Sequence, residues 1–202
     1  MNLFRTITVA LFITLSSTYG QESEYMFKLL QIHDTIKSQK IIDRIKSKDA
    51  VKSTSFFFTQ KYNDQEGLFF IEKKGKYWLV YNYDEHFISN YSVNKHKAHS
   101  NRYVSIDVGV VRSGMGENNY SWFVLFDLEN KAYLVVQNFS YNSGEYDNGV
   151  RFEDQCSSEI KYDKGYLIVN RKCNVKKEDI NYCSYCIETG KYKITADKLI
   201  KQ

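Results

Sequence analysis

Proline is absent from the 202 residues of this chain, although about 5% is usual in globular proteins. Its absence excludes a proline-rich spacer between domains. A strong charge imbalance is also missing, because 28 Lys and Arg face 24 Asp and Glu, a formal net charge of +4. This excess is too small to indicate a nucleic-acid partner, and we expect none.

Only the N-terminus carries a long apolar run. Arg5 precedes an apolar stretch over residues 7–15, and small or polar residues follow over 16–20. The pattern predicts a signal peptide over 1–20, cleaved after Gly20, since the run is too short to span a bilayer. We therefore expect the mature chain 21–202 to be soluble, secreted or periplasmic, not inserted in a membrane, and monomeric.

Catalytic motifs are also lacking. No G-x-S-x-G or other nucleophile pattern occurs. Neighbouring carboxylates such as Glu153 and Asp154 would point to opposite faces of a strand, so they make no acid–base pair. We assign no catalytic residue and no cofactor, and favour a protein that is not an enzyme.

Aromatic residues are plentiful, with 17 Tyr and 13 Phe, which suits a β-rich protein. One stretch, 22–48, has helical spacing instead: Tyr25, Leu29, Ile32 and Ile36 recur at the interval expected of one helix face. The step from Ile36 to Ile41 breaks this stripe. We expect one kinked helix or two short helices there.

Alternating and apolar runs separated by turn signals follow from about residue 53. They predict strands at 56–62, 67–73, 76–83, 87–93, 102–111, 120–128, 132–141, 150–152, 192–194 and 199–200, besides a hairpin at 156–173. Residues 68–71 and 77–81 are apolar on both faces, so their hairpin needs cover on both sides. A helix could cover one side, and a second sheet or a closed barrel wall the other. The predicted fold is mainly β: one domain over 21–202, an antiparallel sandwich or barrel-like meander preceded by an amphipathic helix.

The hairpin at 156–173 turns at Lys164-Gly165. A two-residue turn places Cys156 opposite Cys173 and gathers the apolar side chains on one face. A three-residue loop over 163–165 would shift one strand by one residue and put the two cysteines on opposite faces. We prefer the two-residue register, because it accounts for the cysteine spacing and the polar pattern together.

All four cysteines lie in the C-terminal part of the chain. The hairpin register favours a Cys156–Cys173 disulfide, which leaves Cys183–Cys186 as the second bond. The Cys183-Ser184-Tyr185-Cys186 motif could instead be a thiol oxidoreductase centre or half of a zinc site. It lacks the βαβ setting of a thioredoxin-like centre, so structural disulfides are the preferred interpretation.

A cluster of basic residues, His96, Lys97, His99 and Arg102, lies in a polar stretch that we expect to be a loop. It could contact an anionic partner such as a glycan or a lipid phosphate. His86 is nearby in sequence, so a metal-assisted hydrolase that uses the His86, His96 and His99 region is the alternative. The H-E-x-x-H arrangement is absent, and we predict no metal site.

These features together favour an exported, non-enzymatic binding protein. Its partner would be a protein or an envelope or glycan ligand, and an inhibitor or immunity-type role belongs to the same class.

Overall fold

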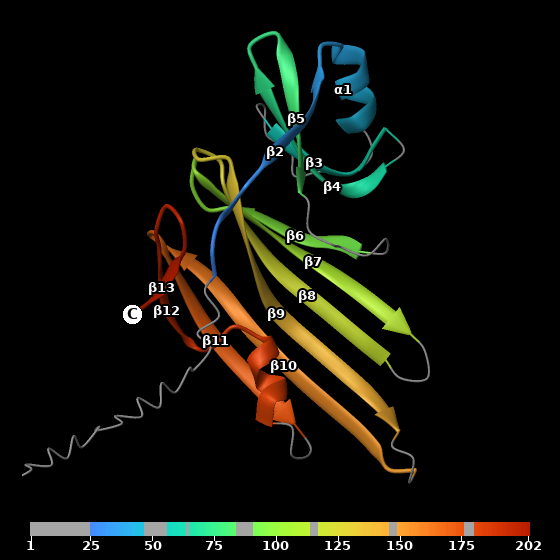
Figure 1. The fold of residues 1–202 in the computed structure, drawn as a ribbon, viewed down its shortest axis with the longest axis vertical. Coiled ribbons are helices and arrows are strands. Elements are labelled where there is room, and N and C mark those ends of the chain that lie inside the picture. Colours follow the sequence, from blue (N-terminus) through green and yellow to red (C-terminus); the bar gives the residue numbers. More distant parts are fainter. Residues whose placement is uncertain are drawn as a thin grey trace, which may run out of the picture.

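Two antiparallel sheets and one short α-helix form the architecture of the computed structural model (Figure 1). The structure describes residues 25–46, 56–63, 65–83, 91–113, 117–145, 149–175 and 180–202. The predicted signal peptide lies outside these residues. The smaller sheet has the order β2-β5-β4-β3, made of β2 (Gln31–Ile36), β3 (Phe56–Tyr62), β4 (Gln65–Lys74) and β5 (Tyr77–Tyr83).

The larger sheet runs from β13 through consecutive strands to β6, and the short β1 pairs with β9. Its strands are β1 (Lys28–Leu29), β6 (Tyr91–Ala98), β7 (Tyr103–Ser113), β8 (Glu117–Asp127), β9 (Ala132–Glu145), β10 (Arg151–Asp163), β11 (Tyr166–Val175), β12 (Gly190–Ile194) and β13 (Leu199–Lys201). A helix α1 (Gln39–Lys46) lies beside the smaller sheet, and a 3₁₀ helix η1 (Ile180–Tyr185) follows β11. The mainly β, antiparallel class predicted from the sequence is confirmed. The described part of the larger sheet ends at β6 and β13 and does not close.

The β4–β5 hairpin lies between two layers, as its doubly apolar pattern predicts. Phe69 and Ile71 are 1% and 0% exposed and share a core cluster with Ile42 of α1. Phe70 points to the opposite face and packs with Phe126 of the larger sheet. The second cover is therefore another sheet and not a barrel wall, and the molecule is layered as helix, small sheet, large sheet.

The helix predicted over 22–48 is wrong for most of its length. Of its described residues, 25–46, only Gln39–Lys46 are helical, whereas Gln31–Ile36 forms strand β2 on the edge of β5. Leu29 and Ile32, expected in the core, are 73% and 61% exposed. The edge of β5 offers backbone partners along the whole of β2, and this tertiary pairing outweighs a weak local helix preference.

The remaining strands agree with the predicted runs within a few residues, with two exceptions. The run predicted at 150–152 is not a separate strand, because it is continuous with the first hairpin strand in β10 (Arg151–Asp163). The other exception is β6. We predicted a strand at 87–93, but β6 is Tyr91–Ala98. The basic stretch expected to be a loop therefore begins inside a strand. His86 lies outside the described residues.

The predicted hairpin register is confirmed. Asp163 pairs with Tyr166 across the two-residue turn, and Cys156 lies opposite Cys173. Lys164 and Gly165 have φ of 43° and 87°, as a tight turn of this hand requires.

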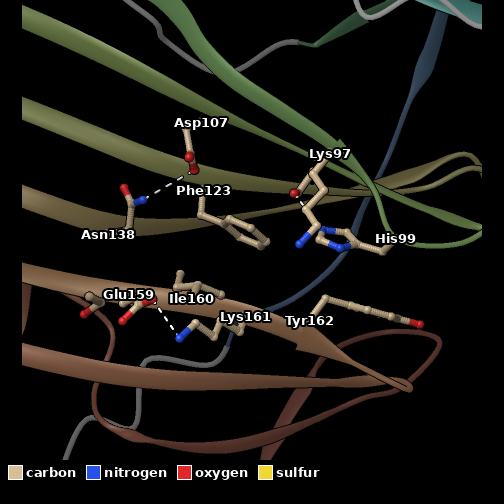
Figure 2. Close-up of a pocket in the computed structure, with 11 residues that line it drawn as sticks. Lys97, His99, Asp107, Phe123, Asn138, Glu159, Ile160, Lys161 and Tyr162 are labelled. Carbon is tan, nitrogen blue, oxygen red and sulfur yellow. Dashed lines mark hydrogen bonds and ion pairs between the residues drawn. The ribbon is translucent and has the colours of Figure 1, made fainter.

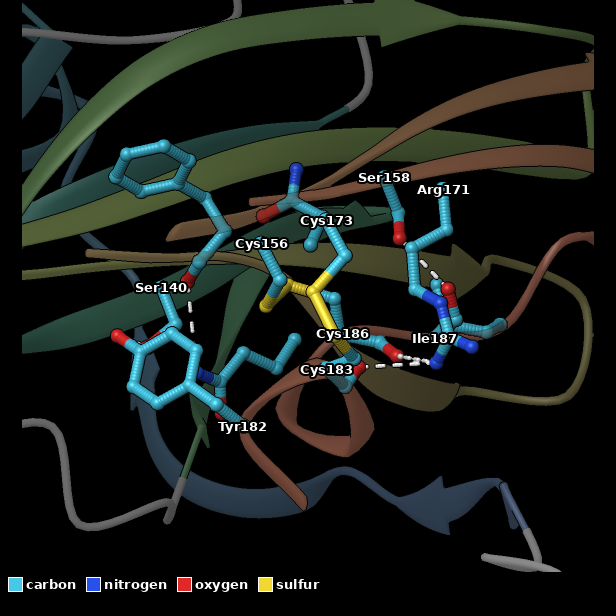
Figure 3. The surroundings of a disulfide bond; sticks show 12 residues. Ser140, Cys156, Ser158, Arg171, Cys173, Tyr182, Cys183, Cys186 and Ile187 are labelled. Atoms are coloured by element: carbon cyan, nitrogen blue, oxygen red, sulfur yellow. Dashed lines mark hydrogen bonds between the residues drawn. A yellow bond between two sulfur atoms is a disulfide. The ribbon is translucent and has the colours of Figure 1, made fainter. Parts of the chain in front are cut away.

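The predicted disulfide pairing is wrong, although all four cysteines are bonded. The bonds are Cys156–Cys186 and Cys173–Cys183, with Cα separations of 6.0 and 5.8 Å (Figure 3). The chain after β11 folds back so that η1 lies over the hairpin face, and contacts join η1 to both β10 and β11. Cys183 lies in η1 and Cys186 directly follows it, and each bonds to a different strand of the hairpin. The two cysteines of the motif are therefore bonded to β10 and β11 and not to each other.

Two disulfides are typical of proteins that fold in an oxidising compartment. Neither helix in the described part of the chain has the length and apolar character needed to cross a membrane.

Candidate functional site

A cleft opens where strands β9 and β10 diverge. The two strands pair from Arg151↔Glu145 to Ser157↔Phe139, and beyond that point β10 runs on without β9. A cleft of about 650 Å³ lies there, between residues 158–162 of β10 and the strands β6 to β9 (Figure 2).

The two walls of the cleft differ in kind. One wall is formed by side chains from one face of strands β6 to β9 and by His99, which directly follows β6: Lys97, His99, Ser105, Asp107, Phe123 and Asn138. Strand β10 contributes five consecutive residues, 158–162. Because successive side chains of a strand alternate between its faces, a wall of consecutive residues shows that β10 presents its edge to the cleft.

A second hollow of about 430 Å³ adjoins the cleft. It shares Asp107, Asn138, Ser158 and Glu159 with the first. The two hollows together follow β10 from Tyr162 back to Ser157, so the site is elongated along this strand.

A wedge formed by Cys186 and Ile187 spans the diverging strands. The backbone N–H of Ile187 donates to the carbonyl of Gln137 in β9 at 3.1 Å, and the Ser158 hydroxyl of β10 donates to the Ile187 carbonyl at 2.6 Å. The disulfide from Cys186 to Cys156 ties the same wedge to β10 (Figure 3). Since Ile187 is 1% exposed, the wedge is part of the core and holds β9 and β10 apart.

A bulge in the β8–β9 ladder shapes the floor of the cleft. Ser121 pairs with Phe139 and Trp122 pairs with Gln137, so Asn138 is an extra residue. Asn138 accepts a hydrogen bond from the Ser121 hydroxyl at 2.8 Å and approaches Asp107 with its Nδ2 at 3.5 Å. The polar groups of the floor are thus largely engaged with one another.

His99 closes one end of the cleft. Its ring stacks on Tyr162 with 4.7 Å between centroids, and its Nε2 lies 2.8 Å from the hydroxyl oxygen of Ser105. Burial, aided by the nearby Lys97 charge, lowers the pKa of His99 below its ordinary value. The imidazole is therefore neutral at pH 7.

The charged residues of the cleft are Lys97, Asp107, Glu159 and Lys161. Lys161 pairs with Glu159 at 2.9 Å, and this hydrogen bond lowers the pKa of Glu159. Asp107 is engaged with Asn138 and with further groups. Lys97 is exposed and has no ion-pair partner among the described residues.

The structure separates the residues of the predicted basic loop. Lys97 and His99 line the cleft. His96 lies opposite Ile106 in the β6–β7 register, and its side chain is outside what the structure describes.

Arg102, the fourth residue of the predicted basic loop, is instead bonded to acidic side chains. Its guanidinium forms two-pronged hydrogen bonds to Asp127, the shortest at 2.6 Å, and a contact of 3.2 Å to Glu129. These bonds raise the pKa of Arg102 above its ordinary value.

Sequence reasoning missed Asp107, Asn138 and Tyr162. Each reads in sequence as an ordinary strand residue, and only the bulge and the departure of β10 from β9 bring them together. The described residues include no group of three or more His, Cys, Asp or Glu placed to hold a metal ion.

Comparison with known proteins gives no match to a family model, a curated protein or a solved structure.

Proposed function

We propose that this chain is an exported, non-enzymatic binding protein, secreted or periplasmic, whose ligand occupies the cleft between β10 and the strands β6 to β9. The observation that carries the proposal is the cleft in the larger sheet, a volume of about 650 Å³ between the edge of β10 and a sheet face. This volume is in the range of ligand sites in proteins. A protein, envelope or glycan partner fits the proposal, and an inhibitor or immunity-type role is one form of it.

The framework around the cleft supports a binding role. The disulfide at Cys156 and the buried Ile187 hold the two strands at a fixed separation. A pre-formed site loses little conformational entropy when a ligand binds, which favours affinity.

Partner capture tests this proposal. The mature chain, with both disulfides verified, is immobilised and exposed to an envelope extract beside the variant Lys97→Trp, which fills the mouth of the cleft. Lys193→Trp on the exposed face of β12 is the matched control. We expect a partner that binds the wild type and the control and is lost from Lys97→Trp.

Equal capture by Lys97→Trp would show that the cleft is not the binding site. Reproducible absence of any partner, together with turnover of a defined substrate, would overturn the binding function itself.

Hydrolysis in the same cleft is the second candidate, and the 2.8 Å contact between His99 and Ser105 favours it. A neutral imidazole beside a hydroxyl could act as a general base. Ser105 is only 5% exposed, however, which leaves its oxygen little access to a substrate. If a hydrolytic activity is found, Ser105→Ala should abolish it; retention of the activity would discard this dyad.

A further inference from the structure

We infer that the ligand of the cleft is an extended peptide segment that carries an acidic residue and adds as a strand to the edge of β10 at residues 158–162. This inference rests on the proposed binding function and names the class of partner. Four observations support it: the direction of the β10 backbone groups, their lack of partners, the shape of the site and the lack of an ion-pair partner for Lys97 among the described residues.

The register of the β10–β11 hairpin fixes where the backbone groups point. In a two-residue hairpin the closing pair, Asp163 and Tyr166, is hydrogen bonded, and the bonded pairs then alternate along the ladder. Pairs such as Ile160↔Val169 and Ser158↔Arg171 are of the non-bonded type. The backbone N–H and C=O groups of Ile160 and Tyr162 therefore point away from β11, towards the cleft.

An independent contact agrees with this alternation. The backbone N–H of Arg171 donates to the Thr189 hydroxyl at 2.9 Å, on the side of β11 away from β10. Its pair with Ser158 is thus non-bonded, as the turn requires.

The backbone groups of Ile160 and Tyr162 that face the cleft have no partner in the described part of the chain. The ladder with β9 ends at Ser157, and no other strand among the described residues takes its place beside residues 158–162. Unpaired strand edges are the sites to which extended peptides bind by adding a strand.

The shape of the site suits an extended chain. Five strand residues span about 16 Å, and the adjoining hollow of about 430 Å³ lengthens the path towards Ser157. Apolar Phe123 and Ile160 line the same cleft, so an apolar side chain of the peptide can be covered.

Charge selects the type of peptide. Glu159 is paired with Lys161, and Asp107 is engaged with Asn138 and with further groups, whereas Lys97 has no ion-pair partner among the residues that the structure describes. An aspartate or glutamate of the peptide would pair with Lys97, and a lysine or arginine at the same place would be repelled.

The experiment selects nine-residue peptides from a displayed random library against the mature chain with its disulfides intact. An enriched peptide is synthesised, and amide hydrogen exchange of ¹⁵N-labelled protein is followed with and without it. We expect the amides of Ile160 and Tyr162 to exchange quickly in the free protein and to be protected about tenfold or more in the complex. The amides of Glu159 and Lys161, already bonded to β11, should be slow in both states.

The role of the Lys97 charge in binding an acidic peptide is tested with Lys97→Glu, and Lys193→Glu is the matched control. We expect Lys97→Glu to weaken an acidic peptide about tenfold and the control to change its affinity less than about twofold. Replacing the acidic residue of the peptide by lysine should restore binding to Lys97→Glu.

Three results overturn the inference: no peptide is enriched, the amides of Ile160 and Tyr162 are already slow in the free protein, or they stay fast in the complex. A glycan or folded partner that is lost from Lys97→Trp, yet leaves these two amides in fast exchange, also overturns it while the binding function stands. Failure of both capture and peptide selection, together with turnover of a defined substrate, would overturn the binding function as well.

Discussion

The imidazole of His99 stacks on the phenol ring of Tyr162, with 4.7 Å between centroids and 26° between ring planes. His99 directly follows the end of β6, and Tyr162 belongs to β10, although three strands separate β6 from β10 in the sheet order. The contact shows that β10 turns back over the face of the sheet after it leaves β9. The cleft exists because of this turn.

The free energy of unfolding below pH 7 should depend on the protonation of His99. Because burial lowers its pKa in the folded state, the unfolded chain binds a proton more readily between the lowered value and the ordinary value near 6.5. The free energy of unfolding should therefore decrease as the pH falls through this window, and less so in His99→Gln. Urea unfolding at several pH values from 7.5 to 5 measures the difference. An NMR titration that places the pKa of His99 at or above 6.5 would contradict the prediction.

The carboxylate of Asp127 should be critical for stability. It is 1% exposed, accepts hydrogen bonds from Arg102 and also from the backbone N–H groups of Glu129 and Asn130 at 3.1 and 3.2 Å. Asp127→Asn would turn an amide donor towards these donors, so we expect a loss of about 3 kcal/mol in the free energy of unfolding. Glu129→Gln, at a side chain 68% exposed, should change it by less than about 1 kcal/mol. Equal effects of the two variants would argue against the network.

Helix α1 offers a matched pair of adjacent residues. Ile42 is 0% exposed against the small sheet, whereas Ile41 is 44% exposed. We expect Ile42→Ala to lower the free energy of unfolding by about 2–4 kcal/mol and Ile41→Ala by less than about 1 kcal/mol. Urea unfolding checks both variants, and similar values would show that α1 does not pack as described.

The disulfide pairing makes a direct chemical prediction. Non-reducing peptide mapping should recover Cys156 joined to Cys186 and Cys173 joined to Cys183. Cys173 is exposed while Cys156 and Cys186 are 0% and 1% exposed, so mild reductant should open Cys173–Cys183 first. A recovered Cys156–Cys173 peptide would refute the observed pairing.

Removing either disulfide should lower the free energy of unfolding, by a different amount for each bond. The Cys156–Cys186 bond closes a separation of 30 residues, and the Cys173–Cys183 bond one of 10. Paired alanine substitutions should cost about 4 and about 3 kcal/mol respectively, since the longer loop restricts the unfolded chain more. Chemical unfolding of the two double variants against the wild type measures this order, and the reverse order would contradict it.

Local chemistry made most strands predictable. The Lys164-Gly165 turn determined the register of the hairpin, because a two-residue loop leaves one way to pair the flanking residues. The doubly apolar runs in β4 and β5 required cover on both faces, and both covers are present. The described segment 25–36 was mispredicted as helical, because strands far away in sequence pair with it: Lys28–Leu29 pairs with β9, and Gln31–Ile36 pairs with the edge of β5.

The sequence by itself determined the β class, the main strands and the face that Cys156 shares with Cys173, since alternation and turn residues act over a few positions. Tertiary structure alone decided which cysteines bond, because the return path of η1 over the hairpin brings Cys186 to Cys156. The tertiary structure also decided where the cleft forms. A strand carries no local signal for where its neighbour will leave it, and the wedge at Ile187, distant in sequence from β9, keeps β10 free of that neighbour.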